Sequence, residues 1–209
     1  VSAYLQESGV KSSVGAALRD LQLSKPLSGD LQLVIPVDGD PGQVLGHVQL
    51  ADNRLRVVSL GLPLEKVNGE LFFTDQETRF TDLTAELWNQ PLRIDYQGQL
   101  RQGDYLVKLG LKGSWSQVRA AQWPALWRQS LGGQGSWQGS LDLQLHPRGK
   151  YDYQAQWQSS LQGVALNWPA PYRKAASQKQ PLMIRAQGNQ KRSRLSLDWQ
   201  NGQIGRAHV

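Results

Sequence analysis

The chain has 209 residues, a formal net charge of +6, 39% hydrophobic residues and no cysteine. That length suffices for one domain, or two small ones, with a real core. The missing cysteines exclude disulfide scaffolds, thiolate zinc sites and cysteine nucleophiles, and no apolar run reaches the roughly 18 residues of a membrane-spanning helix. The first residue is Val rather than Met, so we expect a piece of a longer protein.

Apolar and polar residues alternate with a period of two along most of the chain, which is typical of strands with one apolar face. The alternation is clearest over residues 92–101, and a Gln-Gly-Asp turn at 102–104 predicts a hairpin to a second strand over 105–111. Strict alternation with short connections predicts a mostly β, antiparallel fold. The sheet could pack on itself as a sandwich, close as a barrel, or stay open as a curved groove, and composition alone favours the sandwich.

Two segments have helical features. Residues 12–19 predict two turns of helix, with Ser13 as a cap. Residues 116–134 predict a short helical connector, because Pro124 suits a first helical position and a glycine-rich stretch at 132–135 would end the helix. This connector divides the chain into a first strand block over 1–115 and a second over 135–209, and Lys and Arg outnumber Asp and Glu in the second.

Signatures of catalysis and of metal or cofactor binding are not found in the sequence. Neither the phosphate-binding loop nor the serine-nucleophile elbow occurs. His47, His146 and His208 lie far apart, without a second ligand at metal-binding spacing. Asp38 and Asp40 predict a turn before Pro41 rather than a calcium loop. We therefore predict no enzyme, no metal and no cofactor.

Several phrases of the sequence resemble the YhdP branch of the AsmA-like proteins, which are large bacterial envelope proteins. Residues 161–184 are similar to the family's "LxGxxLxLPxPxxK…PLxI" segment, although Trp168 stands where Leu is common. Residues 62–71 resemble "LPLxxVxGxLxF", residues 87–92 resemble "LWGxPL" with Asn89 in place of Gly, and residues 29–36 fit a third recurring phrase. Together these matches cover most of the chain.

The resemblance implies an interior piece of a periplasm-spanning protein, anchored in the inner membrane elsewhere, with U-shaped sheets that stack end to end. It implies passive movement of glycerophospholipid between the inner and outer membranes, with acyl chains and flanking repeats of the same polypeptide as partners. It brings no catalytic residues. The expected fold is thus a strongly curved open sheet with one or two short helices, and the second block is expected to be incomplete.

The apolar positions of the alternating strands are the expected lining of this groove. They are Leu31, Leu33, Ile35, Val48, Leu50, Leu71, Phe73, Leu92, Ile94, Tyr96, Leu100, Tyr105, Val107, Leu109, Leu111, Leu141, Leu143, Leu145, Tyr151, Tyr153, Trp157, Leu182, Ile184, Leu195, Leu197 and Trp199. Trp123, Leu126 and Trp127 are candidates for a cover over the groove, although a plain connector is favoured. Lys191, Arg192 and Arg194 are candidate contacts for anionic head groups.

Two other functions stay open at this point. A closed β-sandwich without bound lipid would serve as a scaffolding module of the envelope, binding partners through its edge strands. A basic nucleic-acid-binding module would combine the positive second block with aromatic rings, although the aromatic residues lie mostly on the apolar positions.

Overall fold

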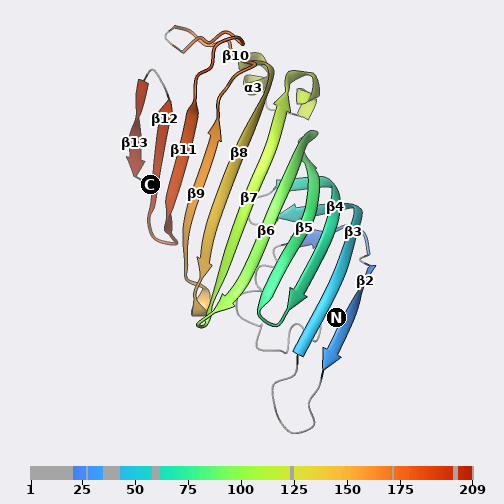
Figure 1. Cartoon of the computed structure of the whole chain (residues 1–209). Coiled ribbons are helices and arrows are strands. Elements are labelled where there is room, and N and C mark those ends of the chain that lie inside the picture. Colours follow the sequence, from blue (N-terminus) through green and yellow to red (C-terminus); the bar gives the residue numbers. More distant parts are fainter. Residues whose placement is uncertain are drawn as a thin grey trace.

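The computed structural model describes residues 21–26, 28–34, 43–57, 62–122, 125–170, 172–199 and 202–208. Its thirteen strands form one antiparallel sheet, in the order β1-β3-β4-β5-β6-β7-β8-β9-β11-β12-β13, with β2 paired to β3 and β10 paired to β8 (Figure 1). The strands are β1 (Leu21–Leu23), β2 (Ser28–Val34), β3 (Gln43–Val57), β4 (Leu62–Thr74), β5 (Glu77–Leu87), β6 (Gln90–Arg101), β7 (Asp104–Ser116), β8 (Leu131–Leu145), β9 (Tyr151–Ser159), β10 (Val164–Leu166), β11 (Leu182–Asn189), β12 (Ser193–Trp199) and β13 (Gly202–His208).

This architecture confirms the predicted fold class. Most strands pair with the next one along the chain, as short connections require. The path of paired strands has two ends, β1 and β13, so the sheet is open rather than closed into a barrel. The described strands form no second layer, so the closed sandwich that composition favours is not what they build.

The connector between β7 and β8 contains two short helices, but it is shorter than the expected range 116–134, because β8 already begins at Leu131. It contains the 3-10 helix η2 (Gln117–Gln122) and the α-helix α3 (Ala125–Ser130), while a further 3-10 turn, η3 (Pro147–Gly149), precedes β9. Strands β7 and β8 are paired on both sides of the expected boundary, so one sheet runs through it. The division into two groove blocks stays a prediction, and the helix expected over 12–19 lies outside the described residues.

The hairpin between β6 and β7 has the turn that the sequence predicts. Gln102 and Gly103 both have positive φ angles, of 53° and 89°, and Arg101 pairs with Asp104. Two consecutive residues in this conformation match the right-handed twist of the flanking strands. The turn therefore fixes the register of β6 against β7, and with it the face on which each side chain lies.

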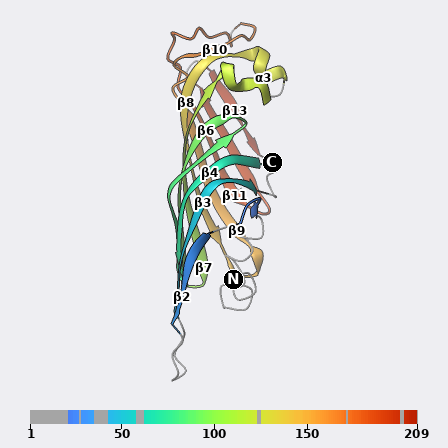
Figure 2. The same ribbon diagram turned by 90° about the vertical axis from the view of Figure 1, so that its right-hand side faces the viewer.

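A row of β-bulges bends the first strands of the sheet. The pairings shift within residues 50–55 of β3, 65–70 of β4 and 80–83 of β5. Each of these segments holds one residue other than glycine in the left-handed conformation: Asp52, Lys66 and Asp82. Bulges increase local twist and bend strands, and beyond them β3 and β4 turn out of the plane of the sheet toward one side (Figure 2).

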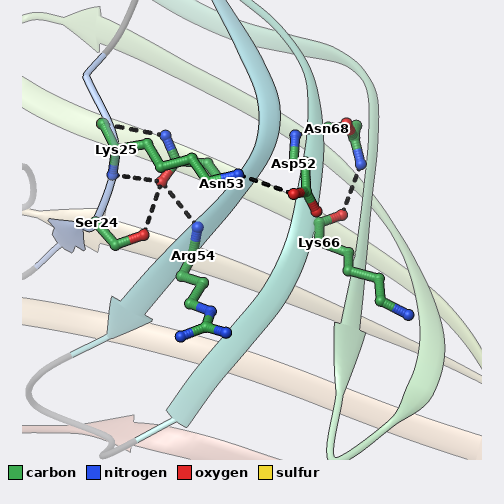
Figure 3. A network of polar contacts seen from close by, with 7 residues as sticks. All are labelled: Ser24, Lys25, Asp52, Asn53, Arg54, Lys66 and Asn68. Carbon is green, nitrogen blue, oxygen red and sulfur yellow. Dashed lines mark hydrogen bonds and ion pairs between the residues drawn. The ribbon is translucent and has the colours of Figure 1, made fainter.

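A buried amide holds this bend to the segment that follows β1 (Figure 3). The side chain of Asn53 is 1% exposed, and its Oδ1 accepts hydrogen bonds from the backbone N–H groups of Arg54 at 2.8 Å and Lys25 at 3.2 Å. Nearby, Lys25 Nζ forms an ion pair of 2.8 Å with Asp52. An unpaired amide in this place would be costly to bury, so these bonds give the bulge of β3 a defined geometry.

Two clusters of buried side chains hold the sheet together. The larger one joins the bent halves of β3, β4 and β5 to β6, and its buried members are Leu50, Leu64, Val67, Leu83, Ala85, Leu92 and Ile94. The smaller cluster lies at the end of β8 near α3, and consists of Leu131, Leu161, Val164 and Leu166, with Trp115, Leu182 and Trp199 packed against it. In the larger cluster, side chains of the bent halves of β3, β4 and β5 contact side chains of β6, β7 and β8. The strands therefore bend toward the face that carries these apolar side chains, and that face is concave.

Candidate functional site

The register of the sheet places the predicted lining residues of the described strands on one face. Directly paired residues share a face, and one row of pairs runs from Val48 through Leu71 and continues to Leu195. The complete row is Val48, Leu71, Phe80, Tyr96, Leu109, Leu141, Ala155, Ala186 and Leu195. We call this surface the inner face. Ile35 lies outside the described residues, and the contact of these side chains with lipid stays a prediction.

The inner face is free of charge within the described strands. None of the residues that the register places on it is Asp, Glu, Lys, Arg or His. Most of the alternate positions of the same strands are polar: on β6, for example, Arg93, Asp95, Gln97 and Gln99 face the other way. Because a charge is expensive to remove from water without a partner, a long surface without one can be covered by hydrocarbon at no electrostatic cost.

Sequence reasoning missed several apolar residues of this face. Leu64, Val67, Leu83 and Ala85 are each at most 8% exposed, and they form the centre of the larger cluster. Leu83 and Ala85 follow the bulge of β5, whereas Val67 lies within the bulge of β4 and Leu64 just precedes it. One extra residue at a bulge changes which alternate positions point inward. The indoles of Trp115 and Trp137 also belong to this face, and the Trp137 and Trp157 rings lie 6.3 Å apart.

Aromatic rings on the inner face lie flat over glycines of neighbouring strands. A Cβ atom built on Gly113 would come within 2.4 Å of the Trp137 ring, and one on Gly46 within 2.0 Å of the Phe73 ring. Each pair sits directly opposite in the register. The glycines therefore leave space for the rings to cover the backbone, which makes the face smooth as well as apolar.

We expect the change Gly113→Ala to lower the free energy of unfolding by about 1–3 kcal/mol, because the new methyl group forces the Trp137 ring out of place. The matched control is Gly110→Ala on the same strand, where the added Cβ meets nothing closer than 3.4 Å. Urea denaturation of both variants, followed by tryptophan fluorescence, measures the difference. Equal stabilities would show that the ring moves aside without cost.

Several polar groups of the inner face have hydrogen-bond partners within the sheet. Gln90 is buried, and its side chain accepts a hydrogen bond of 2.9 Å from the N–H of Ser116 and donates one of 3.2 Å to that residue's carbonyl. Ser159 Oγ donates to the Ser136 carbonyl at 2.7 Å. Thr78 contacts the hydroxyl of Tyr105, whose pKa is raised by burial, so it stays neutral. These bonds satisfy the polar groups named here, whereas the buried Nε1 of Trp199 has no hydrogen-bond partner within the described part of the chain.

The predicted cover and head-group contacts fall at the ends of strands. Leu126 of α3 is 72% exposed, Trp127 belongs to the same helix, and Trp123 lies outside the described residues. Lys191 and Arg192 lie in the turn between β11 and β12. Arg194 pairs with Gln187 and so occupies the polar face, opposite to the lining residues.

His146 lies between two carboxylates, a contact that the sequence did not predict. Its Nε2 is 2.7 Å from Asp152 and its Nδ1 is 3.1 Å from Asp104. The hydrogen bond to Asp152 is the largest cause that raises the pKa of His146 above its ordinary value, and the hydrogen bond to Asp104 is the second. The described residues contain no group of three or more His, Cys, Asp or Glu side chains that could hold a metal ion.

This raised pKa gives a pH dependence with a definite sign. Protonated His146 stabilises the folded state fully below the unfolded-state pKa of about 6.5, and this contribution is lost as the pH rises through the raised folded-state pKa. We expect an NMR titration of His146 to give a pKa above 6.5, and Asp152→Asn to move it down. An unchanged pKa in that variant would mean that the Asp152 contact is not formed in solution.

None of the helices in the described segments is both long and apolar enough to cross a bilayer.

Comparison with known proteins adds a family and one curated relative. The family described as "YhdP protein" matches residues 1–207. The chain is 28% identical over 189 residues to "Intermembrane phospholipid transporter YhdP" of Escherichia coli (strain K12), an alignment that covers 90% of this chain and 15% of the relative. The chain thus spans about a seventh of that relative's length. No solved structure matches significantly.

Proposed function

The chain belongs to the YhdP family, and from this premise we propose that its inner face carries the acyl chains of phospholipids. The observation that supports this most directly is the uncharged, concave inner face. It extends across the described strands from β3 to β12, while charged and amide side chains occupy the other face. The relative from Escherichia coli is named as an intermembrane phospholipid transporter, and phospholipid is the ligand that we propose for this face.

The physical chemistry of such a face suits movement without an energy-consuming step in this segment. Burial of acyl chains is worth roughly 0.8 kcal/mol per methylene, so a lipid gains the same kind of contact at each strand it reaches. Leu, Val, Ile and aromatic side chains alternate along the face without a charged residue to trap a lipid. We infer a passive conduit that binds acyl chains without catalysis.

The open sheet also favours this function over the two alternatives. A scaffolding sandwich would need a second layer over the apolar face, and the described strands form a single sheet. A single-strand nucleic-acid binder needs cations beside its stacking rings, whereas the rings here lie on the uncharged face. The proposal places this segment in the periplasm, with flanking repeats of the same polypeptide on either side and a membrane anchor elsewhere in the full protein.

Extraction of bound lipid tests the proposal. The chain is purified from bacterial envelopes without detergent, extracted with organic solvent, and the extract analysed by mass spectrometry. We expect glycerophospholipids in amounts comparable to the protein. A chain that is folded by circular dichroism, carries no phospholipid and takes none up from vesicles would overturn the proposed function.

A further inference from the structure

Most hydroxyl groups of the inner face lie toward one end of the strands and its indole rings toward the other; Ser159, at the indole end, is the exception. The turns between β6 and β7, β8 and β9, and β11 and β12 lie along one edge of the sheet, which we call the hairpin rim (Figure 1). Hydroxyl-bearing side chains occupy the part of the inner face near this rim, and four tryptophans occupy the opposite part. The first group is Thr78, Tyr96, Tyr105, Tyr151, Tyr153 and Ser193; the second is Trp115, Trp137, Trp157 and Trp199.

Hydrogen bonds tie two hairpins of this rim together. Tyr153 donates from its hydroxyl to Ser193 Oγ at 2.8 Å, which connects β9 to β12 across β11. The N–H of Tyr151 donates to Gln190 Oε1 at 3.2 Å, which connects the start of β9 to the turn after β11. The same turn is held by Asn189, whose Oδ1 accepts from a following backbone N–H at 2.9 Å. These bonds hold the β8–β9 and β11–β12 turns in a defined arrangement, and we call this part of the hairpin rim the corner.

Exposed cations stand at this corner. Lys150 immediately precedes Tyr151, and Lys191 and Arg192 immediately precede Ser193. All three are exposed, and within the described part of the chain none forms an ion pair. The neighbouring carboxylate of Asp152 is already bonded to His146 at 2.7 Å. Among the described residues these cations have no carboxylate partner, and they lie beside hydroxyl donors. Such a surface favours binding of a phosphate group, because hydrogen bonds between charged donors and phosphate oxygens are strong.

We propose that the phosphodiester of a bound phospholipid lies at this corner, beside Lys150, Lys191 and Arg192, while its acyl chains extend along the inner face toward Trp157. The inference rests on the proposed function and adds an orientation to it. From Tyr151 to Trp157 the strand rises about 20 Å, which exceeds the roughly 15 Å of hydrocarbon in one bilayer leaflet. Arg194 lies on the polar face and is not part of this site.

Photo-crosslinking at the two ends of the inner face tests the orientation. Tyr151 or Leu197 is replaced by p-benzoylphenylalanine, the protein is loaded from dimyristoyl phosphatidylglycerol vesicles and irradiated, and tandem mass spectrometry locates the attachment on the lipid. We expect attachment to the glycerol and head group from position 151, and to acyl methylenes from position 197. The same distribution at both positions, or the reverse one, overturns the orientation while leaving the proposed function intact. Absence of adducts at both positions contradicts the proposed function itself.

Charge variants test the cations separately from the fold. We expect Lys191→Gln combined with Arg192→Gln to weaken binding of phosphatidylglycerol about tenfold. The matched control is Arg173→Gln combined with Lys179→Gln, which removes two exposed cations near the opposite ends of the strands and should leave binding unchanged. Equal weakening by both pairs would mean that only net charge matters, and would overturn the site. Glycerophosphate without acyl chains should not compete; full competition would identify a free-anion site instead.

Discussion

The change Leu141→Asp should abolish lipid carriage while leaving the sheet folded. Leu141 is half-buried on the inner face of β8, in the middle of the row that runs from β3 to β12. A carboxylate in hydrocarbon costs about 2.5–3.5 kcal/mol even where it can partly reach water. At about 1.4 kcal/mol for each factor of ten, lipid occupancy at this point should fall by about a hundredfold.

The matched control for this change places the same charge on the other face. Ser140 is the preceding residue of β8, is exposed, and pairs with Gly110 and Gln156 on the polar face. Phospholipid extracted from Leu141→Asp, Ser140→Asp and the parent chain is quantified by mass spectrometry, with circular dichroism as the check on folding. If Leu141→Asp does not fold, Leu195→Asp replaces it, because Leu195 is 43% exposed. Parent-like lipid content in a folded inner-face variant would contradict the conduit.

Alternation of apolar and polar residues was sufficient to predict this face wherever the strands are regular. Over β6 and β7 the hairpin at Gln102 and Gly103 fixes the register, so the predicted inward positions are the observed ones. The prediction failed to include the inward residues beside and within bulges. Phe80 and Leu83 both lie inward although they are three residues apart, because Asp82 adopts a left-handed conformation that adds one residue to the strand.

The glycine-rich stretch before residue 136 was wrongly interpreted as the end of the helical connector. It belongs to β8, which begins at Leu131. Glycine usually weakens a strand, but here Trp115 and Val164 lie against Gly135 and cover its backbone, since a Cβ in that place would come within 2.6 Å of both side chains. The sequence alone does not show which distant ring fills the space above a glycine, so this segment could not be assigned from local patterns.

The segment around Lys174 shows a different limit of sequence reasoning. It belongs to the phrase over 161–184 that carries the family resemblance, but nothing in the local pattern predicts that this lysine is buried. Its side chain is 2% exposed, and its Nζ donates hydrogen bonds to the carbonyls of Leu161 at 2.6 Å, Val164 at 2.7 Å and Ala175 at 3.0 Å. The ammonium group thus supplies donors to three carbonyls of this loop, of which that of Leu161 also accepts a bond of 3.2 Å from the N–H of Val164.

The change Lys174→Met should therefore cost about 3 kcal/mol of unfolding free energy. Methionine keeps an unbranched apolar stem of similar length but removes three donors, and each buried carbonyl left without a partner costs about 1–3 kcal/mol. The loss falls on the smaller core cluster, since Leu161, Val164 and Leu166 are all held through this loop. Because Trp115 and Trp199 pack against that cluster, the tryptophan end of the inner face should loosen with it.

Lys179→Met supplies the matched control, because Lys179 is an exposed lysine of the same loop and exposed substitutions usually change stability by no more than about 0.5 kcal/mol. Urea denaturation gives the global effect, and hydrogen exchange at the amide of Leu166, which bonds to the Lys174 carbonyl at 2.9 Å, gives the local one. Faster exchange there with slow exchange retained at Val107 would place the damage in the loop. Equal stability of the two variants would mean that water satisfies the carbonyls, and that the buried ammonium does not hold this end of the groove.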